Sequence, residues 1–203
     1  MESLHVGFGR VCITPPAPVH MMGYAARKEL SRGVHDDLMA SAVALSAGES
    51  KALVLALDLC SLHTGTVARL KRAIAERTGL TPESILVNTS HTHAGPMVAE
   101  RPGIEMAKTY VGSMIARCIE AADGAMADRA PATLAVGAAP VDIGWNRRER
   151  TEEGEIVLGL NQEGPGLGEA TVWRLERGDR RDVVLFGIPI HGTTLGGDNL
   201  YIS

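Results

Sequence analysis

Aromatic side chains are scarce in this sequence, in which Phe, Trp and Tyr together make up 3% of the 203 residues. A core must therefore be built mainly from Ala, Val, Leu, Ile and Met, and hydrophobic residues at 45% are numerous enough to build one. Long apolar runs are also missing. The longest candidate, 52–57, has the length of a buried strand, whereas a membrane-spanning helix needs roughly 18 apolar residues. The sequence predicts a globular domain with no transmembrane segment.

Basic stripes and secretory features are absent as well. The net charge is -4 and the pI is about 6.0, so nucleic acid is not an expected partner. The first residues lack the basic and apolar regions of a signal peptide, which predicts a cytoplasmic location. The three cysteines, Cys12, Cys60 and Cys118, are odd in number and widely spaced. They argue against a disulfide framework and favour buried thiols in a reducing compartment.

Several catalytic motifs cannot be found. The sequence contains no G-x-S-x-G nucleophile elbow, no P-loop, no Rossmann glycine fingerprint and no CxxC pair. Each of these motifs places a nucleophile, a phosphate-binding loop or a redox pair in a defined turn. The chemistry must be sought in other residues.

The pattern of apolar residues predicts alternating strands and helices in one domain spanning 1–203. Helices are expected at 64–78, where Thr64 can cap the first turn and Gly79 can end the last, and at 102–127. Strands are expected at 4–13, 38–45, 52–59, 85–87, 132–143, 170–175 and 183–190. A long loop is expected at 144–168, with a weak hairpin near 156–160. This order predicts an α/β or α+β fold, with helices covering mixed β-sheets.

The most informative polar feature is the pair His91 and His93, which directly follows a short apolar strand. In an extended chain, side chains two residues apart point to the same side, so both imidazoles can meet one metal ion. An HxH pair is common by chance, and two exposed loop histidines are the alternative. His191 follows the run 183–190 in the same way, with a rim histidine bonded to the backbone as its alternative.

Other polar residues could complete such a site. Zinc in a catalytic site takes three protein ligands and keeps one open position. Asp58, at the end of an apolar run, and Asp198 are carboxylate candidates, although a bond to the backbone would equally explain Asp58. His35 with its two following aspartates is expected to be a solvated cluster. Arg147 opens the long loop and offers donors for an oxyanion.

Taken in order, several segments resemble the neutral and alkaline ceramidases. The segments are Ile13-Thr14-Pro15-Pro16, Met21-Met22-Gly23-Tyr24-Ala25, Gly33-Val34-His35-Asp36, Ala56-Leu57-Asp58-Leu59, the stretch from Asn88 to Pro96, Asn146-Arg147-Arg148 and Pro189-Ile190-His191-Gly192-Thr193-Thr194. The stretch HTHAGP within 91–96 is similar to the family's HTHSGP. The collinear order covers nearly the whole chain and is far more specific than any one segment.

The resemblance implies a Zn²⁺-dependent amidase that cleaves the N-acyl bond of a ceramide-like lipid. By position, it makes His91 and His191 zinc ligands, while His93 and Arg147 contact the reacting group. It also implies a layered arrangement in which two sheets are flanked by helices. Family members are much longer, and their other ligands, a glutamate and a tyrosine, lie beyond the point where this sequence stops. The resemblance therefore implies an N-terminal portion of the catalytic domain, with an incomplete site.

Three alternatives stay open at this point. The first is a truncated, non-catalytic domain that binds metal weakly or acts only in an assembly. The second keeps the zinc chemistry and takes a small amide or ester in place of a lipid. The third is an interaction domain that forms a homo-oligomer through bare strand edges.

Overall fold

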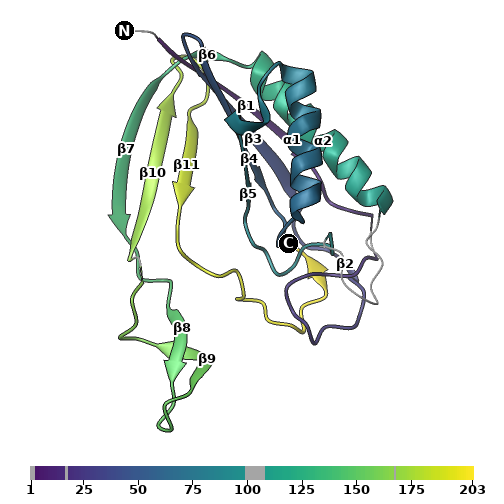
Figure 1. Ribbon diagram of the computed structural model, residues 1–203, viewed down its shortest axis with the longest axis vertical. Coiled ribbons are helices and arrows are strands. Elements are labelled where there is room, and N and C mark those ends of the chain that lie inside the picture. The colour runs from purple at the N-terminus through teal and green to yellow at the C-terminus, as the bar shows by residue number, and fades with distance from the viewer. Residues whose placement is uncertain (1–2, 17, 99–107, 167) are drawn as a thin grey trace. The chain divides into compact units, whose positions relative to one another are not determined.

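The computed structural model describes residues 3–16, 18–98, 108–166 and 168–203 (Figure 1). The chain divides into two compact units. Unit 1 comprises Met1–Ala132 and Gly192–Ser203, and unit 2 comprises Thr133–His191. The single domain expected over 1–203 stays a prediction. Within the described ranges, no helix has both the length and the apolar character of a membrane span.

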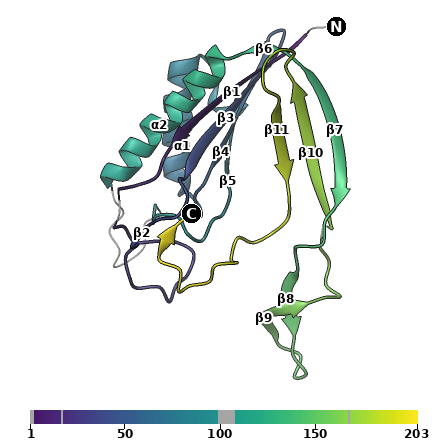
Figure 2. The ribbon, with the colours of Figure 1, turned by 180° about the vertical axis from the view of Figure 1, so that it is seen from behind.

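Unit 1 is built on a five-stranded sheet in the order β5-β4-β3-β1-β6. Its strands are β1 (Leu4–Cys12), β3 (Met39–Ala47), β4 (Ser50–Leu57), β5 (Ile85–Thr89) and β6 (Ala130–Pro131). Strands β4 and β5 are parallel, and the other neighbours are antiparallel. Figures 1 and 2 show both helices, α1 (Thr64–Thr78) and α2 (Lys108–Ala127), on the same side of this sheet. The predicted class, mixed sheets flanked by helices, is confirmed.

The core of unit 1 lies between this sheet and the two helices. Alternate residues of β4, Leu53, Leu55 and Leu57, are fully buried, as expected where one face of a strand packs on a core. Helix α2 lies so close to β1 that a Cβ at Gly7 or Gly9 would collide with main-chain carbonyl oxygens of α2. With few aromatic rings to fill the core, small residues let α2 and β1 approach each other closely.

Helix α1 has the predicted bounds, but the capping residue differs by one. His63, and not Thr64, is the N-cap, and its side chain accepts a hydrogen bond from the NH of Gly65. His63 has the extended backbone that an N-cap requires, whereas Thr64 is already helical. Gly79 ends the helix in the left-handed conformation with φ 73°, as predicted. The predicted start of the second helix, 102–107, lies outside the described residues.

Unit 2 contains a three-stranded antiparallel sheet and a hairpin. The sheet has the order β11-β10-β7, with β7 (Thr133–Pro140), β10 (Glu169–Glu176) and β11 (Val183–Gly187). The hairpin joins β8 (Asn146–Arg150) to β9 (Ile156–Asn161). The expected loop at 144–168 was therefore wrong for β8, whose charged sequence NRRER carries no apolar alternation. A strand exposed on both faces gives no such signal.

The predicted strand 183–190 was too long, and most of its apolar residues are not buried. Strand β11 ends at Gly187, three residues before Ile190, and only Val183 in it is buried. Beyond Val183, the apolar side chains of this strand are exposed or only half-buried. The apolar pattern could not distinguish these two environments.

Two short parallel strands attach the C-terminal segment to unit 1. Strand β12 (Tyr201–Ile202) pairs with β2 (Gly33–Val34). Ile202 is fully buried, and Ser203 donates its NH to the carbonyl oxygen of Ala94 (3.2 Å). A 3-10 turn, η1 (Pro82–Ser84), leads into β5. The segment after Gly192 therefore packs directly beside the histidine pair.

Candidate metal centre

The loop after β5 holds His91 in an unusual conformation. Ser90 donates its NH to the carbonyl oxygen of Leu57 (2.9 Å), and His91 donates to that of Leu59 (3.0 Å). These bonds continue the pairing with the β4 side beyond the end of the strand. His91 has φ 60°, a left-handed conformation that residues other than glycine rarely adopt. Such strain persists where the surrounding structure enforces it, and it is concentrated at functional sites.

The ring of His91 is oriented by the main chain. Its Nδ1 lies 2.7 Å from the carbonyl oxygen of Cys60. Because a carbonyl oxygen only accepts, Nδ1 carries a proton, and in the neutral ring Nε2 then holds the lone pair. Metal-binding histidines characteristically donate their other ring NH to a carbonyl or carboxylate in this way. The His91 side chain therefore fits a zinc ligand.

His93 faces the lone pair of His91. The two Nε2 atoms are 3.3 Å apart, and the ring centroids are 4.9 Å apart in an edge-on arrangement. Two nitrogen ligands of one tetrahedral zinc ion would lie about 3.3 Å apart, given Zn–N distances of about 2.05 Å. The spacing thus suits either a hydrogen bond between the rings or a shared ion.

The predicted convergence of His91 and His93 is confirmed, but the predicted reason for it was wrong. The chain is not extended through this stretch, because β5 ends at Thr89 and residues 93 and 94 lie in a turn. The left-handed residue at 91 followed by the turn brings the rings together. The expectation from an extended strand was therefore right that the two rings meet, although the backbone that brings them together is not extended.

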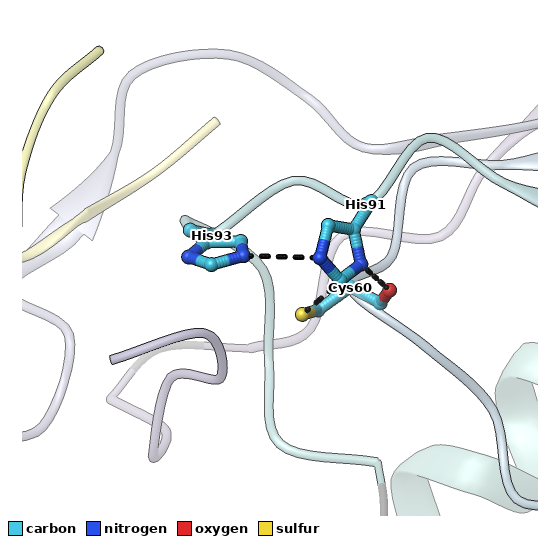
Figure 3. Close-up of side chains that lie close together, drawn as sticks. All are labelled: Cys60, His91 and His93. Atoms are coloured by element: carbon cyan, nitrogen blue, oxygen red, sulfur yellow. Dashed lines mark hydrogen bonds between the residues drawn. The ribbon is translucent and has the colours of Figure 1, made fainter. Parts of the chain in front are cut away.

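Cys60 is the third member of the cluster. One ligand atom each from Cys60, His91 and His93 can be chosen so that all lie within 4.8 Å of one another. Figure 3 shows the three side chains grouped together, with dashed lines joining His91 to each of the other two. Cys60 is buried, and this burial raises the pKa of its thiol. The expectation of buried thiols is confirmed for Cys60 and Cys118 and is wrong for Cys12, which is exposed. The Cys60 thiol, moreover, lies beside imidazoles.

Arg27 fixes the loops around the histidine pair. Its guanidinium donates to the carbonyl oxygens of His93 (2.9 Å), Gly197 (3.2 Å), Met22 (3.4 Å) and Gly196 (3.4 Å). It also lies 5.0 Å from the centre of the Tyr24 ring. Partial burial lowers the pKa of Arg27, while Tyr24 and Asp198 oppose that shift. One side chain thus connects three separate segments of unit 1.

A cavity of about 190 Å³ opens beside His93. Tyr24 forms one wall, with its ring centroid 5.0 Å from that of His93 and its hydroxyl donating to the carbonyl oxygen of Thr193 (3.1 Å). The remaining lining comes from Thr92, Ala94, Gly192, Thr194, Leu195, Gly196, Asn199 and Ser203. Because most of these residues are small, the cavity leaves room for a ligand next to the His93 ring.

The other two predicted site residues lie in unit 2. A nitrogen of the Arg147 guanidinium, Nη2, is 2.9 Å from Nδ1 of His191. Because arginine only donates, Nδ1 of His191 is the acceptor. His191 is the last residue of unit 2, whereas His91 belongs to unit 1. An ion shared by His91 and His191 therefore stays a prediction.

The remaining polar candidates bond the main chain or lie in solvent. Asp58 accepts a hydrogen bond from the NH of Met39 (2.9 Å), which confirms the backbone-bonded alternative. His35 is 74% exposed in its side chain and bonds Asp36, as expected for a solvated cluster. Asp198 is exposed, and its negative charge favours a higher pKa of Arg27.

Sequence reasoning missed the site roles of Cys60, Tyr24 and Arg27. Cys60 had a usable signal, since it comes two residues after Asp58 at the end of an apolar strand. Tyr24 lies in a segment that supported the resemblance but received no role. Arg27 had none, because a lone arginine in a loop looks the same whether it is solvated or enclosed.

Comparison with known proteins identifies relatives for part of the chain. No family model matches. Neutral ceramidase 1 of Arabidopsis thaliana is 33% identical over 95 residues, which is 45% of this chain and 12% of that protein. The neutral ceramidase of Oryza sativa subsp. japonica is 35% identical over 95 residues, with the same coverage. The aligned segment is thus a small fraction of the curated relatives.

Solved structures match the entire chain. The neutral ceramidase of Pseudomonas aeruginosa superposes with a TM-score of 0.83 over 100% of this chain and 34% of its own, at 17% identity. A ceramidase complexed with C2 gives a TM-score of 0.81, 100% and 33% coverage, and 17% identity. At this identity the likeness shows the fold. The chain is therefore related to the neutral ceramidases and corresponds to part of their fold.

Proposed function

We propose that the chain forms part of a zinc-dependent hydrolase that cleaves the amide bond of an N-acylsphingosine or of a smaller N-acyl substrate. The observation that carries this proposal is the His91 ring, whose Nδ1 is held by a carbonyl oxygen and whose Nε2 faces His93. The relatives are named neutral ceramidases, which supports the choice of an amide bond. The cavity beside His93 supplies space for the substrate group that contains the amide bond.

In this proposal His91 and His191 hold the zinc ion. When bound, zinc polarises a carbonyl group and activates water, which is the chemistry that amide hydrolysis needs. For neutral His191, the bond accepted from Arg147 places the ring proton on Nε2. His191 must therefore release Arg147 in order to ligate the ion through either nitrogen, which frees the guanidinium for the substrate.

His93 and Arg147 act on the reacting group. His93 lies against the cavity, where its ring can donate to the developing oxyanion or pass a proton to the leaving amine. Arg147 offers a planar pair of donors for negative charge. Removal of one such donor typically slows turnover by roughly 100-fold or more.

The test is hydrolysis of a short-chain N-acyl sphingosine analogue by the 203-residue chain with added zinc. His91→Ala should abolish turnover and bound zinc, and His93→Ala should slow turnover by roughly 100-fold. His5→Ala is the matched control, because His5 lies on β1 and bonds only the nearby Ser3 carbonyl among the contacts described. Wild-type rates from His91→Ala would remove the hypothesis.

A non-catalytic, metal-binding domain is the second candidate. The observation that favours it is the Cys60, His91 and His93 group, whose possible ligand atoms lie within 4.8 Å of one another inside unit 1. Elemental analysis separates the two candidates: zinc bound without hydrolysis supports the second. Homo-oligomer formation and the cytoplasmic location stay predictions, and the first is tested by size measurements across concentration.

A further inference from the structure

We propose that the thiolate of Cys60 is an additional ligand of the ion held by His91, so that the centre combines a thiolate with imidazole. The inference rests on the proposed metal site at His91 and adds a ligand from within unit 1. Its basis is the cluster in which one ligand atom each from Cys60, His91 and His93 lie within 4.8 Å of one another.

The main chain fixes Cys60 against the His91 ring. The carbonyl oxygen of Cys60 accepts from Nδ1 of His91 (2.7 Å) and from the Thr89 hydroxyl (3.5 Å). Its Sγ lies 3.8 Å from Nδ1 of His91. The residue that orients the imidazole therefore also places sulfur beside it.

Packing separates Cys60 from an ordinary core cysteine. Cys118 is fully buried among apolar neighbours in the main hydrophobic cluster, where a thiol acts as a small apolar group. Cys60 is also buried, at 3% exposure, but it is not a member of that cluster. Its neighbours include two imidazoles, which are better suited to coordinating an ion than to packing.

The added ligand also determines which ions are accepted. Thiolate and imidazole donors favour zinc and other transition metals over magnesium and calcium, which prefer oxygen ligands. Coordination replaces the proton on Sγ, and this proton leaves to solvent. Magnesium at large excess should therefore not displace the ion.

Cobalt substitution tests the inference without measuring turnover. Co²⁺ added to the full chain should give visible ligand-field bands together with a near-ultraviolet thiolate-to-cobalt charge-transfer band. Cys60→Ser should lose the charge-transfer band and keep ligand-field bands, whereas Cys118→Ala and Cys12→Ala should keep both. His91→Ala should lose all of them.

A second variant protects the test against misfolding. The double variant Cys12→Ala, Cys118→Ala leaves Cys60 as the only cysteine of the chain and should retain the charge-transfer band. Ligand-field bands without a charge-transfer band in the wild-type chain would overturn the Cys60 ligand and leave the His91 site intact. A charge-transfer band that survives in Cys60→Ser would overturn it as well. Absence of every cobalt band would instead refute the metal site itself.

Discussion

At the scale of single residues, Gly23 shows how closely the loops pack on His93. Its φ is 114°, and a Cβ there would collide with the His93 side chain. Gly23→Ala should therefore destabilise the fold by about 1–3 kcal/mol through overpacking, in addition to backbone strain. Urea unfolding measures the change. Gly79→Ala is the control, because Gly79 also has positive φ but nothing lies within 4 Å of the position that a Cβ would take there; equal losses in both variants would contradict the collision.

Arg147 gives a second residue-scale prediction. Its bond to Nδ1 of His191 competes with coordination by that imidazole. Arg147→Met should therefore leave zinc affinity unchanged or raise it, while hydrolysis falls by roughly 100-fold. Calorimetric zinc titration and the amide assay give the two values. Arg148→Met, in the same exposed strand, should change neither, and a loss of zinc affinity in Arg147→Met would contradict the competition.

Residue identity could be read from the sequence, whereas local conformation could not. The histidine pair and the solvated His35 were predictable from composition and spacing. The left-handed backbone of His91 was not, because it depends on hydrogen bonds to Leu57 and Leu59, which adjoin the site only after β4 and β5 pair. The four carbonyl partners of Arg27 likewise come from segments up to 170 positions away.

At the scale of elements, the contact between α2 and β1 depends on glycine. Gly9→Ala would drive a Cβ into the carbonyl oxygen of Ala121, so we expect it to cost about 1–3 kcal/mol or more of stability. Gly112 lies in α2 at an exposed position with open space around it, and Gly112→Ala should stabilise the chain by about 0.5–1 kcal/mol. Thermal unfolding of both variants checks the opposite signs.

The buried thiol of Cys118 in helix α2 should make the stability of the fold depend on pH. Burial raises the pKa of the Cys118 thiol to about 12 and raises the pKa of Tyr110 as well. Because the unfolded thiol titrates near about 8.5, its stabilising contribution is complete below that pH. It is then lost as pH rises toward about 12, at up to about 1.4 kcal/mol per pH unit. Between pH values of about 8.5 and about 12, the free energy of unfolding should fall less steeply with pH in Cys118→Ala than in the wild-type chain. An unchanged slope would contradict the assignment.

Element prediction succeeded where apolar residues mark the element, including the exposed strand β7, and failed where charged residues replace them. Helix α1 and strands β3 and β4 were found from their aliphatic residues at the expected period. Strand β8 was missed because its charged residues carry no period, and β11 was extended into Ile188–Ile190 because apolar character continues past its last ladder bond. Hydrogen bonding, and not hydrophobicity, sets those limits.

At the scale of the whole molecule, the two units differ in how much apolar surface they bury. Among the described residues, every member of the main hydrophobic cluster belongs to unit 1. In unit 2, all of β7 is exposed, and large side chains such as Trp173 and Phe186 are also exposed. Because local stability follows buried apolar contact, unit 2 should open more readily than unit 1.

Hydrogen–deuterium exchange measured by mass spectrometry tests this difference. Amides of β10 and β7 should exchange faster than those of β3 and β4, although both pairs form regular antiparallel ladders. Comparing ladder with ladder removes hydrogen bonding as the explanation and leaves burial. Adding zinc should slow exchange around 89–94 if the ion binds His91, because a ligand that binds only the folded state opposes opening. Equal protection of the two ladders would mean that apolar burial does not govern the stability of unit 2.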